Sequence, residues 1–369
     1  MTAEGQLGQL GQLGQLGQSG EHGRRGAIPL TCDQANEIIW AFEAGVDALR
    51  TEPGVAPVLV VSVRSSDVGR LRRPPVHFPA VVIVVAQDAG VSSVATVGDV
   101  SITDRASPAQ SPWVAVRDCA AALDALTANV ARSPVAALTL VQLLRAGAGL
   151  SLEQGLLAES LAYSTLQSGA EFAAWTARRP TPLAQTTGQD GDPLLVERDC
   201  DTLRIALNRP HVHNAYNTSM RDALAEVLAV PLLDTAVEVR LEGTGPSFCS
   251  GGDLTEFNTF DDPASANLVR IGRNPGRLLG VLSSRVTAVV HGYCVGSGIE
   301  LAAFASKVLA RGEVTIWLPE LAMGLLPGAG GTVSLPRRIG VGRTAWLALS
   351  GSRIDTATAI SWGLLDGWT

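Results

Sequence analysis

The sequence predicts an α/β fold, with a layered core in the second half of the chain and an additional α/β-to-helical region before it. In the second half, strand-like runs alternate with helix-like runs: strand 202–208, turn 209–214, helix 218–229, then strands 236–242, 286–291 and 307–310. Strands that alternate with helices are typical of sheets covered by helices. In the first half, short runs rich in β-branched residues precede a long helix-like stretch.

The first half is predicted to begin with a helix over 31–49, because its apolar residues recur at helical spacing. Thr31 or Asp33 is the candidate N-cap of this helix. The runs 58–63 and 80–86 are almost wholly apolar, which predicts buried parallel strands.

From Trp113 to about Arg179 the chain is predicted to be helical. Three helices are expected, over 114–131, 134–144 and 151–178. Ser151 is the predicted N-cap of the third helix, with Gln154 as its capping-box partner.

Composition divides the chain into four parts. Residues 5–18 repeat Gly-Gln-Leu, and such frequent glycine opposes helix, so 1–26 is predicted to be a disordered low-complexity tail. A short partner-binding role is the alternative. The polar run 181–193 contains Gly and Pro and is predicted to link a 27–180 region to a 194–369 core.

The overall composition narrows the classes of function. The 369 residues are 46% hydrophobic and 17% charged, with a net charge of −7. This balance argues against nucleic acid as the main partner. Neither a membrane-spanning run nor a signal peptide is found, so a cytoplasmic protein is expected.

The five cysteines are scattered, without a CxxC pair, and predict no metal site. Cys249 and Cys294 lie within the motifs described next, where a nucleophile is conceivable. A small buried residue fits both positions better, because no histidine is placed to activate them. Arg337 and Arg338 are candidates for binding phosphate, and a surface or subunit contact is the alternative.

Two carboxylates beside glycine-rich turns form the most informative feature. Glu300 lies in HGYCVGSGIELAAF (291–304), and Glu320 lies in WLPELAMGLLPGAGG (317–331). Two carboxylates with different pKa values can exchange protons with a substrate next to a polarised carbonyl. The small residues allow a ligand to approach backbone N–H groups that stabilise an oxyanion. The plainer alternative is that each glutamate only caps a helix.

Five motifs in order resemble the crotonase (enoyl-CoA hydratase/isomerase) superfamily. They are LNRPHVHNAYNTSM (207–220), GPSFCSGGDLTEF (245–257), the 291–304 motif, WLPELAMGLLPGAGGTVSLPRRIG (317–340) and LSGSRIDTATAISWGLLD (349–366). Any one of them alone is a weak signal, whereas their order over the second half is specific. The resemblance implies a crotonase-like ββα spiral core.

The resemblance also implies roles for individual residues. The backbone N–H groups of Ser250 and Ser297 would form an oxyanion hole for a thioester, although the family commonly has glycine where Ser297 stands. Glu300 and Glu320 would be the acid/base pair of a hydratase. CoA, arriving as part of the substrate, would bind at Ser250, Gly252, Asp253 and Leu254, without a metal or another cofactor. His291 is expected to have a structural role.

The chain departs from the family pattern at its end. Family members continue beyond the GLLD segment into helices that cover the active site, whereas this chain ends at Thr369. Residues 119–180 resemble that missing segment, placed upstream of the core. A fusion is the alternative, in which 27–180 is a degenerate, non-catalytic crotonase-like unit. Both interpretations, the displaced segment and the fusion, predict that Tyr163, Phe172 and Trp175 cover the pocket or an interface. The plainer alternative is that these residues only fill the core of the helical region itself.

The expected function is hydration of a 2-enoyl-CoA. Isomerisation of an enoyl-CoA, a specialised lyase or hydrolase reaction on another CoA thioester, and acyl-CoA binding without turnover remain alternatives. The family resemblance further implies a homo-oligomer, a trimer or a hexamer.

Overall fold

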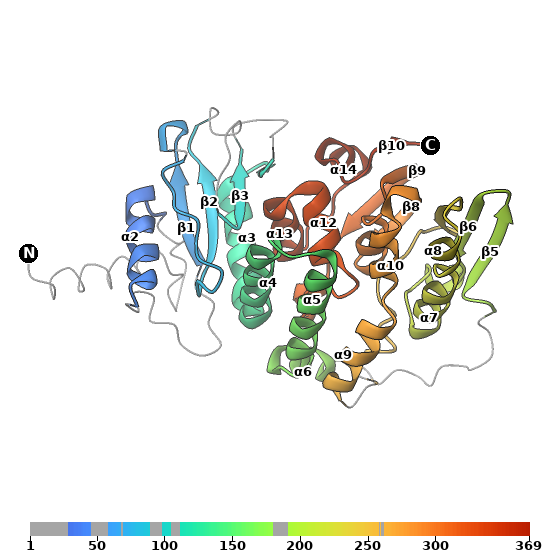
Figure 1. Cartoon of the computed structure of the whole chain (residues 1–369). Coiled ribbons are helices and arrows are strands. Elements are labelled where there is room, and N and C mark those ends of the chain that lie inside the picture. The colour runs from blue at the N-terminus through green and yellow to red at the C-terminus, as the bar shows by residue number, and fades with distance from the viewer. Residues whose placement is uncertain are drawn as a thin grey trace, which may run out of the picture. The chain divides into compact units, whose positions relative to one another are not determined.

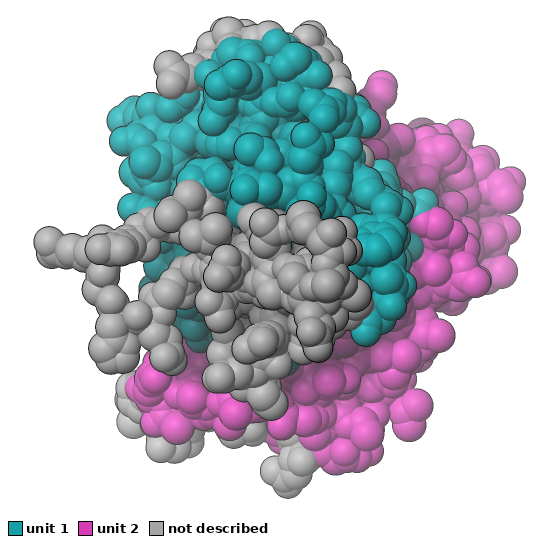
Figure 2. All heavy atoms as spheres, turned by 90° about the vertical axis from the view of Figure 1, so that its left-hand side faces the viewer, with its two compact units in different colours: residues 1–148, 340–350 teal, residues 149–339, 351–369 magenta. Residues whose placement is uncertain are grey.

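The computed structural model describes residues 29–45, 58–67, 69–88, 98–104, 111–179, 191–257, 259 and 262–369. The chain divides into two compact units, one of residues 1–148 and 340–350, the other of residues 149–339 and 351–369 (Figure 2). The predicted tail, 1–26, and most of the predicted linker, 181–193, lie outside the described residues.

The first unit contains a parallel sheet in the order β1-β2-β3-β4. Its strands are β1 (Val58–Val63), β2 (Val81–Ala86), β3 (Val100–Thr103) and β4 (Trp113–Ala115). The two strands predicted from apolar runs are confirmed, and burial on both faces explains why those runs do not alternate. Helix α2 (Cys32–Glu43) begins at the predicted N-cap Thr31, whose capping box includes Gln34.

Three helices complete the first unit: α3 (Cys119–Arg132), α4 (Pro134–Gly147) and α13 (Val341–Ser350). The prediction of helix from residue 114 was wrong, because residues 113–115 pair with β3 and Asp118 then caps α3. The Asn129 side chain of α3 donates to the carbonyls of Leu349 and Ser350 on α13. Part of the predicted 194–369 core thus packs in the first unit.

The second unit is built on a six-stranded sheet in the order β10-β9-β8-β7-β6-β5. The strands are β5 (Leu194–Asp199), β6 (Thr202–Leu207), β7 (Glu238–Gly243), β8 (Val286–Val295), β9 (Lys307–Trp317) and β10 (Gly367–Trp368). Only β5 and β6 pair antiparallel. The four predicted strands are confirmed, and β8 and β9 run further than expected, towards the carboxylate motifs.

The helices of this unit lie against the sheet or pack on one another (Figure 1). They are α5 (Leu152–Gln167), α6 (Ala170–Ala177), α7 (Thr218–Val227), α8 (Val230–Leu233), α9 (Pro263–Gly272), α10 (Pro275–Val281), α11 (Ser297–Ala302), α12 (Gly331–Ile339) and α14 (Thr356–Trp362). The predicted helix 151–178 is in fact two helices, because α5 ends at Ser168 and Gly169 is the N-cap of α6. The capping box of Ser151 and Gln154 is confirmed.

Segments far apart in the sequence lie side by side in this unit. Helix α5 packs on α9, α10 and α12, and α6 packs on the 3-10 turn Glu320–Met323 (Figure 1). Helices α5 and α6, from the region predicted to precede the linker, therefore belong to the same unit as both carboxylate motifs. Within the described part of the chain, no helix is both long and apolar enough to cross a bilayer.

Candidate active site

The turn between β8 and α11 places Glu300. Strand β8 ends at Val295, Gly296 is the N-cap of α11, and Glu300 lies in the first turn of that helix, 1% exposed. Gly296 has φ 47° and ψ −122°, a combination that L side chains rarely adopt. A Cβ atom at Gly296 would also lie 2.4 Å from Glu320 Oε1. Glycine at this position therefore allows the second carboxylate to approach the turn that carries the first.

Glu320 begins the 3-10 turn Glu320–Met323, just after β9 and Pro319. Its Oε1 atom lies against Gly296. Its Oε2 atom is buried and has no hydrogen-bond partner among the described residues. Buried acceptors in proteins are normally hydrogen-bonded, so an exception of this kind in a cavity marks a place for a ligand group.

The glycine-rich turn 328–332 is held by two carboxylates in alternation. Glu300 Oε2 accepts hydrogen bonds from the amides of Ala329 (2.7 Å) and Gly331 (2.9 Å). Glu159 of α5 accepts from the amides of Gly330 (2.7 Å) and Thr332 (2.9 Å), and from the Thr332 hydroxyl (2.7 Å). Four successive backbone amides thus bind Glu300 and Glu159 in turn, which fixes the Glu300 carboxylate relative to α5.

Glu159 was missed by the sequence analysis, although a signal was present. It is 2% exposed and follows Leu156 on the buried side of α5. A glutamate among buried apolar residues of a helix is unusual, because carboxylates are rarely buried without partners. Its partners, Gly330 and Thr332, are distant in the sequence, and this pairing could not be read from the pattern alone.

The three carboxylates influence one another's protonation. Burial raises the pKa of Glu320 to about 8 and that of Glu159 to about 7. Burial, followed by the negative charges of Glu320 and Glu159, raises the pKa of Glu300 well above its ordinary value. Neighbouring carboxylates cannot all ionise at little cost, so the group retains protons at neutral pH.

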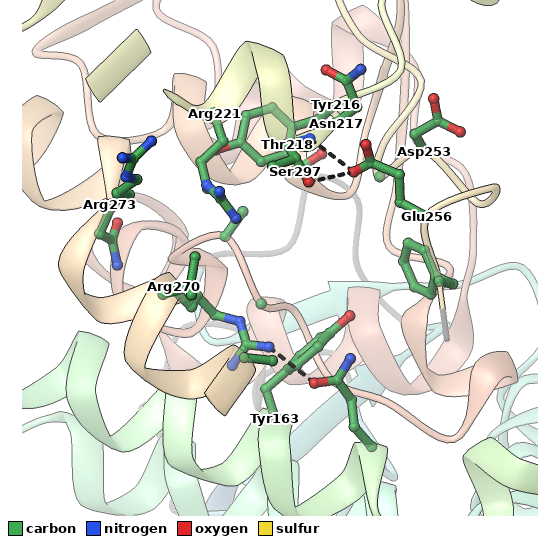
Figure 3. Close-up of a pocket in the computed structure, with 18 of the residues that line it drawn as sticks. Tyr163, Tyr216, Asn217, Thr218, Arg221, Asp253, Glu256, Arg270, Arg273 and Ser297 are labelled. Carbon is green, nitrogen blue, oxygen red and sulfur yellow. Dashed lines mark hydrogen bonds between the residues drawn. The ribbon is translucent and has the colours of Figure 1, made fainter. Parts of the chain in front are cut away.

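A cavity of about 520 Å³ adjoins the carboxylates (Figure 3). Of the predicted site residues, Gly252, Asp253, Ser297, Glu300 and Glu320 line it, whereas Ser250 and Leu254 are not among the lining residues. Other residues of the lining come from α5, α6, α7 and α9 and from the segments next to α7 and α9. They include Tyr163, Phe172, Tyr216, Arg221, Arg270 and Arg273.

The two predicted oxyanion donors differ in their surroundings. Ser297 is the first residue of α11, so its N–H has no acceptor within the helix. The N–H of Ser250 donates to the carbonyl of His213 at 3.0 Å. Backbone pairing of Cys249 with Cys294 brings the two segments together. The role of both amides as an oxyanion hole stays a prediction.

Asp253 is engaged in the structure of its own loop. Its carboxylate accepts from Arg209 at 2.8 Å and from the N–H and hydroxyl of Thr255. Burial acts to raise the pKa of Asp253, but the hydrogen bonds from Thr255 and Arg209 outweigh it and leave this pKa lowered. A ligand at this loop would therefore meet backbone groups and a carboxylate that is already paired.

Other candidates from the sequence have structural roles. Burial raises the pKa of the Cys249 thiol to about 11 and also raises that of Cys294, which argues against a thiolate nucleophile. His291 bonds to the Gly245 carbonyl and to Arg311, as a structural residue would. Arg338 pairs with Asp366 rather than facing the cavity. Within the described ranges, no group of His, Cys, Asp and Glu side chains could hold a metal ion.

Helices α5 and α6 contribute an aromatic wall. The Tyr163 ring packs so closely on Gly328 that a Cβ atom there would lie 2.5 Å from it. Phe172 stacks on Trp175, and both rings contact Phe257. Tyr163, Phe172 and Phe257 line the cavity, and Trp175, which is not among the lining residues, packs on Phe172 and Phe257.

Comparisons with known proteins identify the family of this unit. A model of the enoyl-CoA hydratase/isomerase family matches residues 199–368. The 2,3-dehydroadipyl-CoA hydratase of Escherichia coli K12 is 34% identical over 174 residues, which cover 47% of this chain and 68% of that protein. The chain belongs to the enoyl-CoA hydratase/isomerase family. The crotonase resemblance of the five motifs is thus confirmed.

Two further crotonases show the same partial match. The mitochondrial enoyl-CoA hydratase domain-containing protein 2 of Mus musculus is 32% identical over 54% of this chain and 66% of that protein. A crystal structure of enoyl-CoA hydratase from Thermoplasma volcanium is 32% identical over 48% of this chain and 72% of that one, with a TM-score of 0.44. The chain spans about two thirds of the length of the curated relatives it matches. The matched share of the relative's length is 68%, 64% and 63% for three of them.

The region matched by the family model leaves out α5 and α6. In this crotonase, Tyr163 and Phe172 therefore reach the cavity, and Glu159 reaches the turn beside Glu300, from a part of the chain that precedes the matched region.

Proposed function

We propose that this crotonase adds water across the double bond of a 2-enoyl-CoA. The observation that carries the proposal is the pair Glu300 and Glu320, two carboxylates from separate turns that line one cavity with raised pKa values. Acid/base catalysis on a substrate needs one group that accepts a proton and one that donates it near neutral pH. A buried pair that shares a proton meets this need.

The reaction uses the pair as a unit. One carboxylate accepts a proton from water while the water oxygen bonds to the β-carbon, and the electrons of the double bond move towards the thioester carbonyl. The other carboxylic acid then donates its proton to the α-carbon, so the elements of water are added and the pair again holds one proton. Because the two groups titrate together, neither is assigned a single role.

The amides of Ser297 and Ser250 would stabilise the negative charge that develops on the thioester oxygen. The Ser297 N–H points out of the first turn of a helix, where the helix dipole adds to the effect. The Ser250 N–H would exchange its bond to the His213 carbonyl, or share it, when substrate binds. The 250–254 loop would hold the CoA side of the substrate, as the family resemblance implies.

Helices α5 and α6 would complete the site. Glu159 holds the turn beside Glu300, and Tyr163 and Phe172 line the cavity. We propose that the two helices cover the active site of this crotonase.

The experiment is a hydration assay with a short 2-enoyl-CoA. Loss of the absorbance of the conjugated thioester, with formation of 3-hydroxyacyl-CoA, is the expected result. A 3-enoyl-CoA is the matched test substrate, since an isomerase would instead create the conjugated absorbance. Binding of both thioesters without conversion of either would contradict the proposal.

A further inference from the structure

Charged side chains occupy opposite ends of the cavity (Figure 3). Three arginines line one end, namely Arg221 of α7, Arg270 of α9 and Arg273, the C-cap residue of α9. We call them the arginine cluster. Asp253 and Glu256 lie on the other side of the view, with Ser297 between the two groups. A ligand held at Ser297 therefore extends towards the arginine cluster in one direction and, in the other, towards Glu256 and the Asp253 carboxylate that already pairs with Arg209.

The positive charge of the arginine cluster is only partly balanced. The Asp222 carboxylate pairs with both Arg221 (2.8 Å) and Arg273 (2.7 Å). Arg270 makes no ion pair within the described part of the chain. Among the described ion pairs, the three guanidinium groups share the single carboxylate of Asp222, and the charge of Arg270 also acts to lower the pKa of the buried Glu159. Charge excess in a partly desolvated pocket favours an anionic ligand.

Arg270 is held in place by neutral groups. Its Nη1 donates to the Ser160 carbonyl (3.2 Å), the Ser160 hydroxyl (3.1 Å) and the Ser164 hydroxyl (3.1 Å), and its Nη2 donates to Gln167 Oε1 (3.0 Å). The guanidinium carbon also lies 4.5 Å from the centre of the Tyr163 ring. These contacts fix the guanidinium without neutralising it, so little conformational entropy remains to be lost when an anion binds.

The guanidinium of Arg270 keeps unused donors. Of its five N–H groups, the two on Nη1 and one on Nη2 serve the α5 contacts, which leaves the Nε–H and one Nη2–H without an acceptor in the described structure. Two donors of one guanidinium match the two oxygens of a carboxylate. The cavity thus contains a fixed, unpaired cation with donors to spare.

We propose that the substrate is a 2-enoyl-CoA whose acyl chain ends in a carboxylate, bound by the arginine cluster with Arg270 as its main contact. This inference rests on the proposed function, because the 250–254 loop is then the CoA end. The acyl chain leaves the thioester in the opposite direction, towards α9. The other source of anionic oxygens is CoA itself, whose phosphates would reach the cluster only if the substrate lay the other way round.

The test compares two six-carbon substrates that differ only at the far end, 2-hexenoyl-CoA and its counterpart with a terminal carboxylate. The full chain is assayed as wild type and as Arg270→Met, Arg270→Lys and Arg273→Gln. Arg277→Gln is the matched control, because Arg277 is a neighbouring arginine outside the cavity lining. Dissociation constants for both thioesters and for free CoA are measured alongside kcat/KM.

Wild type is expected to favour the carboxylate-ended substrate by about tenfold or more in kcat/KM, as a charge-assisted pair predicts. Arg270→Met should bring the ratio of the two kcat/KM values close to one, and Arg270→Lys should retain part of the preference, since its charge remains. Arg277→Gln should keep it in full.

Equal wild-type kcat/KM for the two substrates would overturn the inference. So would a uniform loss of affinity for both thioesters and free CoA in Arg270→Met and Arg273→Gln, which would place a CoA phosphate at the cluster. If neither substrate is hydrated, the proposed function fails separately. The dissociation constants then decide the inference, because the carboxylate-ended thioester must still bind more tightly to wild type and not to Arg270→Met.

Discussion

Gly296 determines how closely the two carboxylates of the site approach. It has a positive φ, and Glu320 Oε1 occupies the space that a side chain would need. The amides of Ala329 and Gly331, in the 328–332 turn, then fix the Glu300 carboxylate from the other side through their hydrogen bonds to it. At the scale of single residues, the site therefore depends on backbone geometry as much as on the two carboxylates.

Gly296→Ala is expected to lower kcat/KM at least about 100-fold and to destabilise the fold by about 1–3 kcal/mol, because the new Cβ displaces Glu320 and the backbone is strained. Gly312→Ala is the control, since φ is also positive there (+78°) but nothing lies within 4 Å of its Cβ. Hydration kinetics and denaturant unfolding measure both variants. Equal activity in the two would contradict the role of Gly296.

Glu159→Ala is expected to destabilise the protein by about 2–4 kcal/mol, because the amides of Gly330 and Thr332 lose their acceptor in a buried place. The kcat should fall about 10–100-fold, since the same turn positions Glu300. Glu153→Ala, at an exposed position of the same helix, is the control. A Glu159→Ala variant with the kcat and the unfolding midpoint of Glu153→Ala would exclude this positioning role.

At the scale of secondary-structure elements, the contact of α5 with α12 keeps Glu159 near the site. Gly155 of α5 faces Val333 of α12, and a Cβ at Gly155 would lie 2.9 Å from Val333 Cγ2. Gly155→Val is expected to cost about 1–3 kcal/mol of stability through overpacking. Adding Val333→Ala should recover much of this loss, because the volume is exchanged across the contact. Additive effects in denaturant unfolding of the four variants would show that the two helices do not touch there.

Several elements could be predicted from the sequence because their signals are local. The apolar runs of β1 and β2, the Ser151 capping box and both carboxylate turns are of this kind. Strand β5 was missed, since LLVERD is largely exposed and lacks an alternating apolar pattern. The break at Gly169 was missed because the residues before Ser168 and after Gly169 both have a helical composition, which suggested one continuous helix.

The rest of the candidate site arises from contacts between distant residues. Glu159 meets Gly330 and Thr332, and Arg270 meets Ser160 and Ser164, across more than a hundred positions of sequence. No local pattern specifies such pairs. Tyr163 and Phe172 line the cavity, as the resemblance of the 119–180 segment predicted, whereas Trp175, which was predicted with them, is not among the lining residues.

At the scale of the whole molecule, the buried carboxylates link stability to pH. A carboxylate whose pKa is raised in the folded state binds its proton more tightly there than in the unfolded chain. Its contribution to stability is therefore complete below the ordinary value of 4.5 and is lost as the pH rises through about 8 for Glu320. The same direction holds for Glu159, through about 7.

The Glu320→Gln variant is accordingly expected to be more stable than wild type at pH 9, by about 1–4 kcal/mol, and to approach wild type as the pH falls to 5. The free energy of unfolding, measured by denaturant titration across this range, gives the difference directly. A gain that grew towards acid pH would show that the pKa of Glu320 is lowered in the folded protein.

The central claim is that Glu300 and Glu320 act as one acid/base pair, and the most direct measurement is the hydration rate of Glu300→Gln, Glu320→Gln and the double variant. Each single variant should lose about 100- to 10,000-fold in kcat with the substrate still bound. The double variant should lose little more, because the removal of either carboxylate already abolishes the function of the pair. Two independent, multiplying losses, or a single variant that retains wild-type kcat, would contradict the account.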